Sequence, residues 1–305
     1  MQGFSPSEMS IMKRMHLSIT LISAILLQVA CRDIPATFQP VRSHSLPGEI
    51  EISQFRNQGY AVPHAGTSLW VLDSLGSIQD SLPFTDYPAR VTAFTDVRHQ
   101  TGNFLFLMES GATENNRQAW KINLPDKKVE RIDLTEFFER LKAEGIDAVQ
   151  IEGVAATENG FMLINRGSEQ FPKNHLIFTE FDFWKNPEET KIQLMLCGHS
   201  DKDAFSGISN IDYDYRSGHA YLSVSGGDGP HRNEIWMIPD ILSKKNYAAI
   251  NPHKILNLSK EFPIFKELKT TSVTVLGSTQ DRIDLWVSAV DTTGKTKLFE
   301  VAWKK

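Results

Sequence analysis

Short apolar runs alternate with clusters of Gly, Asn, Asp, Ser and Pro along almost the whole chain after residue 31. Runs of this length that are bounded by turn residues are typical of β-strands, and long helical patterns are rare here. The turn before the second strand of each group contains Gly or Asp, at Gly66, Gly102, Gly160, Gly218 and Asp281. The pattern therefore predicts an all-β chain built from hairpins.

The strand pattern repeats five times, as a strand, a turn, a second strand, a polar loop and a third strand. Apolar positions at Val91, Val154, Ile208 and Val273 anchor four of the repeats and recur roughly every 60 residues. A β-propeller fits such repeats, because the radial packing of small sheets protects their edges. We predict a propeller of five blades. Six blades and an antiparallel sandwich are the two alternatives.

One segment breaks the β pattern and predicts a short inserted helix at residues 133–145. Its apolar side chains form one stripe, at Leu134, Phe137, Phe138 and Leu141. Asp133 is expected to cap the start, with Glu136 three residues later, and Gly145 to take the left-handed position at the end. We expect the stripe to pack on the sheets. Residues 239–247 and 260–268 predict similar short excursions.

Composition narrows the partner classes. The chain has 305 residues, a formal net charge of −5 and 41% hydrophobic residues. This apolar content suffices for a globular core, and the small net charge does not indicate binding to a nucleic acid or to a membrane surface. We therefore expect no nucleic-acid partner.

The N-terminal segment predicts export. Lys13 and Arg14 precede the run MHLSITLISAILLQVAC, which is too short to span a membrane and is typical of a signal peptide. Cys31, directly after Ala30, resembles the lipobox of bacterial lipoproteins, in which that cysteine carries the lipid. Gln28 departs from the aliphatic residue that is usual in this motif. The alternative is a plain signal peptide that is cut near Ala30.

These features divide the chain into a leader and lipoprotein signal peptide at residues 1–30, a tether at 31–45 and a single propeller domain at 46–305. We predict a bacterial cell-envelope location, periplasmic or surface-exposed at the outer membrane, with membrane attachment through the lipid alone. Cys197 is then the only other cysteine, so it has no partner for an internal disulfide. Its apolar neighbours favour a buried, inert thiol over a nucleophile.

Propeller geometry predicts where polar side chains meet. The innermost strand of a blade lines a central channel, and the loop between strands two and three returns to the face where the innermost strand begins. Glu152 opens an innermost strand and the stretch Asn165-Arg166-Gly167 opens such a loop, so we expect both at one mouth of the channel. The other innermost strands are expected to begin near Glu51, Arg90, Ser206 and Thr271.

Convergent polar groups at a concave mouth predict a ligand site. The predicted ligand-binding residues are Glu109, Arg117, Glu152, Arg166, Asp228 and His231. Arg117 and Arg166 would orient an anion through bidentate hydrogen bonds. Glu109, Glu152 and Asp228 would accept hydrogen bonds or hold a cation. The competing interpretation is structural, with Arg90 and Glu152, or Arg166 and Glu109, as ion pairs between blades.

Two stretches carry a family resemblance: IEGVAATENGFMLINRG, followed by NHLIFTEFD, and FLMESGATENNRQAWKINLP, followed by DLTEFF. They resemble an uncharacterised bacterial lipoprotein β-propeller family, similar to phytase-like (esterase-type) and SdiA-regulated propellers. The resemblance covers residues 50–240 in segments and implies a propeller fold, while the phytase-type relatives imply a phosphate ester and bound Ca²⁺. The chain lacks the dense acidic clusters that such a site needs, and Asp228 in GGDGPH is the one metal ligand we name.

Three functional hypotheses follow. The first is an exported propeller that binds a small polar or anionic ligand, or an envelope protein, at one channel mouth. The second is a Ca²⁺-assisted phosphoesterase that uses the same mouth, and the third is a non-catalytic envelope scaffold. Common hydrolase and nucleotide-binding motifs do not occur in the sequence. A Ser110 or Ser225 nucleophile with His231 is the remaining triad arrangement, so whether the chain is an enzyme stays open.

Overall fold

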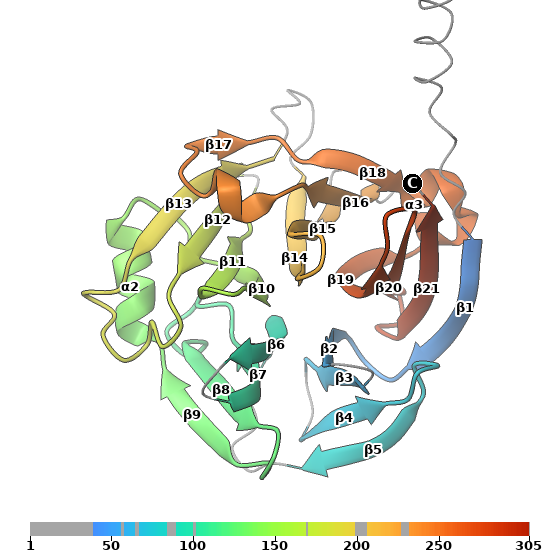
Figure 1. The fold of residues 1–305 in the computed structure, drawn as a ribbon, viewed down its shortest axis with the longest axis horizontal. Coiled ribbons are helices and arrows are strands. Elements are labelled where there is room, and N and C mark those ends of the chain that lie inside the picture. The colour runs from blue at the N-terminus through green and yellow to red at the C-terminus, as the bar shows by residue number, and fades with distance from the viewer. Residues whose placement is uncertain are drawn as a thin grey trace, which may run out of the picture. The chain divides into compact units, whose positions relative to one another are not determined.

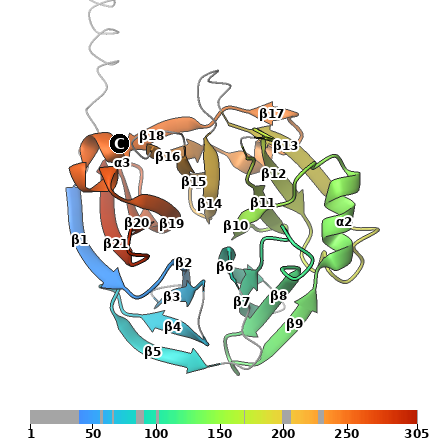
Figure 2. The ribbon, with the colours of Figure 1, turned by 180° about the vertical axis from the view of Figure 1, so that it is seen from behind.

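The computed structural model describes most of the chain from Gln39 to Lys304. The described residues are 39–55, 58–64, 67–83, 90–99, 102–168, 170–198, 206–226 and 232–304. They form five sheets arranged in a ring around a central axis (Figure 1), and Figure 2 shows the same ring from behind. The predicted five-bladed β-propeller is therefore confirmed.

Each blade contains four antiparallel strands. The first blade consists of β2 (Ile50–Phe55), β3 (Gln58–Pro63), β4 (Ser68–Leu72) and β5 (Ile78–Pro83). The second consists of β6 (Ala93–His99), β7 (Gly102–Met108), β8 (Gln118–Asn123) and β9 (Val129–Asp133). The third consists of β10 (Ile151–Ala156), β11 (Phe161–Asn165), β12 (Asn174–Thr179) and β13 (Ile192–Cys197), to which β17 (Ala249–Ile250) adds in parallel.

The fourth blade consists of β14 (Gly207–Asp214), β15 (His219–Gly226), β16 (Arg232–Ile238) and β18 (His253–Asn257). The fifth consists of β19 (Lys269–Ser278), β20 (Arg282–Val290), β21 (Thr296–Lys304) and β1 (Gln39–Leu46). β2, β6, β10, β14 and β19 are the innermost strands, and each contacts the next around the ring. The contact between β19 and β2 closes the circle.

The fifth blade joins the two ends of the described chain. β1 pairs antiparallel with β21, with Gln39 opposite Ala302 and Leu46 opposite Thr296. The chain therefore enters the propeller at Gln39, inside the segment 31–45 that the sequence favours as a tether. Local sequence pattern does not reveal this strand, because its partner lies at the opposite end of the chain.

Apolar side chains fill the spaces between the blades. A cluster of buried apolar residues lies between each pair of neighbouring blades. All residues of β11 are buried, because neighbouring blades cover both faces of its sheet. This double burial explains why the middle strands appear as continuous apolar runs and lack the alternation of a strand that faces water on one side.

The predicted helix is α2 (Thr135–Ala143), between β9 and β10. Its stripe side chains have an exposed fraction of 0% and belong to the cluster between the second and third blades, so the stripe packs on the sheets as predicted. Leu134 occupies the cap position directly before the helix. Asp133, which the sequence predicts as the cap, lies one residue earlier and still binds the first turn. The Asp133 carboxylate accepts hydrogen bonds from the backbone N and the hydroxyl of Thr135 at 2.9 and 2.7 Å. Gly145 has the expected left-handed backbone, with a φ of 102°.

The two shorter excursions also contain helical turns. η1 (Ile241–Lys244) lies in the first of them, and α3 (Leu258–Glu261) and η2 (Pro263–Lys266) lie in and beside the second. None of the helices in the described part of the chain has the length and apolar character needed to cross a membrane.

Candidate functional site

Three innermost strands share an irregularity at the end of the ring axis where they begin, which we call the start face. The pairing register shifts by one residue at Glu152 in β10, Ser209 in β14 and Thr271 in β19. A β-bulge of this kind leaves one residue out of the ladder and redirects its side chain, and bulges are common beside binding sites. The start face corresponds to the channel mouth that the sequence predicts.

A buried imidazole joins two carboxyl groups at the start face. His64 directly follows β3, and its Nε2 lies 3.0 Å from Oε1 of Glu51. Its Nδ1 lies 3.3 Å from Oε2 of Glu49. The pairing of Ile50 with Pro63 brings these residues together, and the exposed fractions of Glu51 and His64 are only 3% and 8%. We call Glu49, Glu51 and His64 the His64 group.

Asn210 connects the His64 group to the far side of the ring. Its Nδ2 donates a hydrogen bond to Oε2 of Glu51 at 3.3 Å, and its Oδ1 accepts one from the backbone N of Val273 at 3.3 Å. Asn210 belongs to β14, which is not a neighbour of β2 in the ring. The Asn210–Glu51 bond therefore crosses the central axis, and Glu51 points into the middle of the start face.

The His64 group contains ionisable side chains whose pKa values move apart. Burial raises the pKa of Glu51 to about 7, although its hydrogen bond to His64 opposes the change. Burial alone would lower the pKa of His64, but the close contact with the Glu49 carboxylate and the hydrogen bond to Glu51 outweigh it and raise that pKa to about 9. The close contact with the His64 imidazolium lowers the pKa of Glu49 to about 2. At neutral pH the group thus holds a carboxylate, an imidazolium and a carboxyl near half-protonation, which is a pattern found at functional sites.

Glu152 and Arg166, which the sequence places together, both lie at the start face. Oε1 of Glu152 accepts a hydrogen bond from Nε2 of Gln150 at 2.6 Å, and the Glu152 charge helps to raise the pKa of Glu51. Nη2 of Arg166 donates to the backbone O of Ser225 in the next blade at 3.5 Å. The guanidinium covers Gly207, where any side chain would collide with it. The glycine at the start of β14 thus makes room for Arg166.

Glu109 and Arg117 lie in the second blade and hold the elements around α2 together. Oε2 of Glu109 accepts a hydrogen bond from the backbone N of Gln118 at 3.1 Å. Nη1 of Arg117 lies 2.8 Å from Oε1 of Glu139 in α2, and the Arg117 carbonyl accepts from the backbone N of Leu134 at 2.8 Å. These contacts give both residues a structural task, and their role in ligand binding stays a prediction.

The other predicted site residues, Asp228 and His231, lie outside the described residues, as does the predicted lipidation site Cys31. Within the described residues, no group of three or more His, Cys, Asp or Glu side chains fits a metal ion. The Ca²⁺ hypothesis therefore draws no support from the part of the chain that the structure describes.

Sequence reasoning missed three residues of this site. Glu51 was expected only as a strand start, and Glu49, His64 and Asn210 were not proposed. A usable signal exists for two of them: Glu-Ile-Glu opens β2 and Pro-His closes β3, so an antiparallel hairpin must bring them to one end. Asn210 gives no such signal, because its partner lies across the ring.

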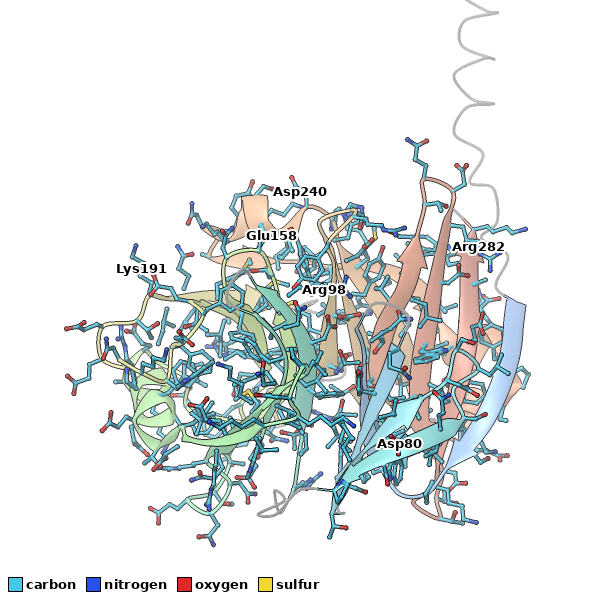
Figure 3. All side chains as sticks on the ribbon, turned by 60° about the horizontal axis from the view of Figure 1, so that its bottom comes forward. Asp80, Arg98, Glu158, Lys191, Asp240 and Arg282 are labelled. Atoms are coloured by element: carbon cyan, nitrogen blue, oxygen red, sulfur yellow. The ribbon has the colours of Figure 1, made fainter. Side chains whose placement is uncertain are left out.

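The opposite end of the axis also carries buried carboxyl groups, and their oxygens accept hydrogen bonds from the protein, as those of Glu51 do. Burial raises the pKa of Asp96, whose carboxylate accepts from Ser53 at 3.1 Å and from Arg98 at 3.0 Å. Asp212 accepts from the backbone N of Val275 at 2.6 Å. The hydroxyl of Tyr213 donates to Glu158 at 3.0 Å, and Figure 3 labels Arg98 and Glu158 on the ribbon. These pairings indicate a structural network.

The loop that starts with Arg166 borders a separate cavity on the third blade. The cavity has a volume of about 460 Å³, and its lining includes Asn165, Lys173 and His175 together with apolar side chains. This size suits a small molecule. The start face is nevertheless the better candidate, because several ionisable side chains with shifted pKa values converge there.

Comparison with known proteins supports the fold and says little about activity. Residues 91–204 match the model of a family described as "Family of unknown function (DUF6929)". No protein of curated function matches the sequence.

Two solved structures share the architecture. A thermostable family-43 glycoside hydrolase has a TM-score of 0.52 and 9% identity, with 86% of this chain and 90% of that chain covered. The Bacteroides ovatus protein GH43B of a xyloglucan locus has a TM-score of 0.53 and 8% identity, with 87% of this chain and 54% of that chain covered. The chain thus spans about half the length of GH43B. Identities this low show the propeller fold alone, and neither structure is a phytase or a lipoprotein by its description.

Proposed function

We propose that the protein binds a small, uncharged ligand rich in hydroxyl groups, such as a sugar, at the start face. The observation that carries this proposal is the His64 group, which brings an imidazolium between two carboxyl groups beside Glu152 and Asn210. Such a set both donates and accepts hydrogen bonds, and hydroxyl groups need both. The groups are held by backbone and side-chain contacts before any ligand arrives, which lowers the cost of binding.

The predicted pair of anion-binding arginines is not free as a pair, which favours an uncharged ligand. The sequence suggests two arginines that together orient an anion, but the guanidinium of Arg117 is engaged by Glu139. At the start face Arg166 and the His64 imidazolium stand beside the carboxyl groups of Glu49, Glu51 and Glu152. Arg90 and Lys269 also act on Glu49 by charge, so the start face holds several cations as well as carboxyl groups. The fold similarity to family-43 glycoside hydrolases makes sugars the first probes to try.

The test is a thermal-shift titration of the full chain against mono- and oligosaccharides. A ligand that binds only the folded state at a concentration of 100 Kd adds about 2.7 kcal/mol to the free energy of unfolding. We expect a rise in Tm of several degrees with at least one sugar. Glu152→Gln should abolish this rise, whereas Glu130→Gln, at an exposed position of β9, should retain it.

Other outcomes of the titration would favour the alternatives. A rise in Tm that requires both Ca²⁺ and a phosphate ester would favour the phosphoesterase. The absence of any rise with sugars, phosphate esters or metals would contradict the ligand proposal and favour an envelope protein as partner, or a scaffold.

A hydrolase that uses the same face is the second candidate, because the pKa of Glu51 is about 7. A general acid works best when its pKa lies near the working pH, and Glu152 would be the neighbouring carboxylate base. The test is the hydrolysis of aryl glycosides at pH 7. Glu51→Gln should reduce the rate by about 100- to 10,000-fold, and a wild-type protein without activity on any such substrate would count against this candidate.

The location is part of the proposal and rests on residues 13–31 of the sequence. We propose a bacterial envelope protein that is anchored by a lipid on Cys31. Cys31→Ser should remove the acyl groups and release the protein from the membrane fraction. Acylation that persists in this variant would contradict the anchor.

A further inference from the structure

An apolar pocket lies at the edge of the ring where Figure 1 draws α3 beside the start of β1. It has a volume of about 240 Å³, and its lining consists of Phe262, Pro263, Ile264, Phe265, Phe299 and Val301. Ile264 is 43% exposed, although it is a large apolar side chain. We call the segment Phe262–Lys266 and this pocket the apolar corner. Pro263 is also exposed, whereas Phe265, Phe299 and Val301 are almost fully buried. The exposed apolar surface is therefore the rim of the pocket, at Pro263 and Ile264.

The chain enters the propeller at the apolar corner. The first described strand, β1, begins at Gln39, and Pro40 lies directly opposite Val301 of β21. Val301 lines the pocket, and Phe299 of the same strand packs against Phe265, with ring centroids 4.7 Å apart and ring planes tilted by 45°. The first residues of the propeller and the apolar corner therefore share one edge of the molecule.

The predicted lipid anchor limits how far this edge lies from the membrane. Gln39 follows Cys31 by eight residues in the sequence. A fully extended chain spans at most about 3.6 Å per residue, so these eight residues reach roughly 29 Å at most. The edge that contains Gln39 must lie within that distance of the bilayer, which is about the diameter of a small domain.

We propose that the apolar corner rests on the bilayer surface and inserts Ile264 and the neighbouring Pro263 among the lipids. The inference rests on the lipid anchor proposed above and is independent of the sugar proposal. Apolar side chains that reach 5–10 Å into the interface add to the binding supplied by acyl chains. Lys260 and Lys266 flank the corner and can meet anionic headgroups. Glu261 and Glu267 nearly balance them, so the contact depends mainly on apolar insertion.

The chain itself offers a good experimental design. Cys197 is buried, and burial raises the pKa of its thiol to about 12, so it stays unreactive in the folded protein. In the acylated chain the Cys31 thiol carries the lipid, so a cysteine introduced by Ile264→Cys is the accessible thiol for an environment-sensitive fluorophore. The matched control is Ile78→Cys in β5 of the first blade, because Ile78 is also 43% exposed. Both full-length variants are reconstituted by their own anchor into vesicles of phosphatidylethanolamine and phosphatidylglycerol.

The expected result is a blue shift of the label at position 264 in vesicles and loss of its emission when the lipids carry a nitroxide quencher. The label at position 78 should show neither change. Equal exposure of both labels to water in vesicles would overturn the inference. A blue shift at position 264 that already occurs in the Cys31→Ser variant without vesicles would overturn it too, in favour of a second protein copy.

Two negative results can be told apart: Cys31 is not acylated, or the apolar corner of an acylated chain does not contact the membrane. The intact mass of the purified chain reports acylation of Cys31. A chain without acyl groups removes the premise and overturns the inference. An acylated chain whose label at position 264 stays in water overturns the inference alone. Neither result changes the thermal-shift test of sugar binding at the start face.

Discussion

Nδ2 of Asn210 donates a hydrogen bond to Oε2 of Glu51 at 3.3 Å, across the axis of the ring. The two residues belong to β14 and β2, which do not touch as neighbours. Both side chains are almost fully buried, with exposed fractions of 2% and 3%. The bond therefore fixes the orientation of the carboxyl group that also contacts His64.

Asn210→Ala should lower the free energy of unfolding by about 1–3 kcal/mol, because it removes the hydrogen bonds to Oε2 of Glu51 and to the backbone N of Val273, although Oε1 of Glu51 keeps its contact with His64. Urea denaturation monitored by tryptophan fluorescence measures the change. Asn246→Ala is the matched control, since Asn246 makes one exposed side-chain bond to Gln193 at 2.9 Å. Equal losses in the two variants would contradict a special role for the bond across the axis.

His64 should make the protein less stable as pH rises. Its folded pKa is about 9 and its ordinary value is 6.5, so the protonated form is favoured by folding. The resulting stabilisation is fully present below pH 6.5 and is lost as pH rises through 9. By linkage it is on the order of 3 kcal/mol. The measurement is the free energy of unfolding at several pH values between 6.5 and 9.5.

His64→Gln is the variant that isolates this effect. The difference in free energy of unfolding between wild type and variant should be largest near pH 6.5 and should shrink toward pH 9.5. Glu51 contributes in the same direction, because its folded pKa of about 7 is raised and its contribution is lost as pH rises through 7. A difference that is constant between pH 7.5 and 9.5 would show that the imidazole is neutral in the folded protein.

Sequence patterns predicted the architecture because each blade is local. Its strands follow one another along the chain, so turn residues and apolar runs reveal the strands, and the stripe of α2 reveals the helix. β1 was not predicted, since it completes a sheet with a strand from the opposite end of the chain. No neighbouring segment of the sequence pairs with residues 39–45, so the local pattern does not predict a strand there.

The site was predicted only in part, for a related reason. Blade geometry places strand starts and certain loops on one face, and this was enough to bring Glu152 and Arg166 to the start face. The same rule selected Arg117, but it contains no information on the competing carboxylate of Glu139. The cross-axis partner of Glu51 depends on the number of blades and on the depth of each side chain, which the sequence pattern does not specify.

Two glycines at the junction of the third and fourth blades should respond differently to alanine. A Cβ at Gly153 would meet backbone atoms, the N of Ile211 at 2.7 Å and the Cα of Asn210 at 2.9 Å. Relief requires the two blades to separate, so Gly153→Ala should cost about 1–3 kcal/mol of stability. At Gly207 the obstacle is the guanidinium of Arg166, which can swing away.

Gly207→Ala should therefore cost less stability than Gly153→Ala but displace Arg166 from the start face. Urea denaturation measures the first effect. The sugar-induced rise in Tm measures the second, and it should fall in Gly207→Ala. A larger loss of stability for Gly207→Ala would mean that Arg166 is locked in place and not displaceable.

Arg117 and Arg166 provide the sharpest comparison between the sequence interpretation and the structure. The Arg117 side chain is 9% exposed and contacts Glu139, which is 53% exposed, so the arginine stem is packed while its partner is screened by water. Arg117→Gln should lower the free energy of unfolding by about 1–3 kcal/mol through lost packing. Glu139→Gln should have a small effect, since Glu139 is screened by solvent.

The effect on ligand binding should be larger for the Arg166 variant than for the Arg117 variant, the opposite of the order expected for stability. Arg166→Gln should reduce the sugar-induced rise in Tm with little change in stability, because the hydrogen bond from Arg166 to the backbone O of Ser225 is long, at 3.5 Å. Arg117→Gln should keep the rise in Tm intact, measured from its own lower baseline. Loss of the rise in Arg117→Gln but not in Arg166→Gln would instead place the ligand over the second blade, beside Glu109 and α2.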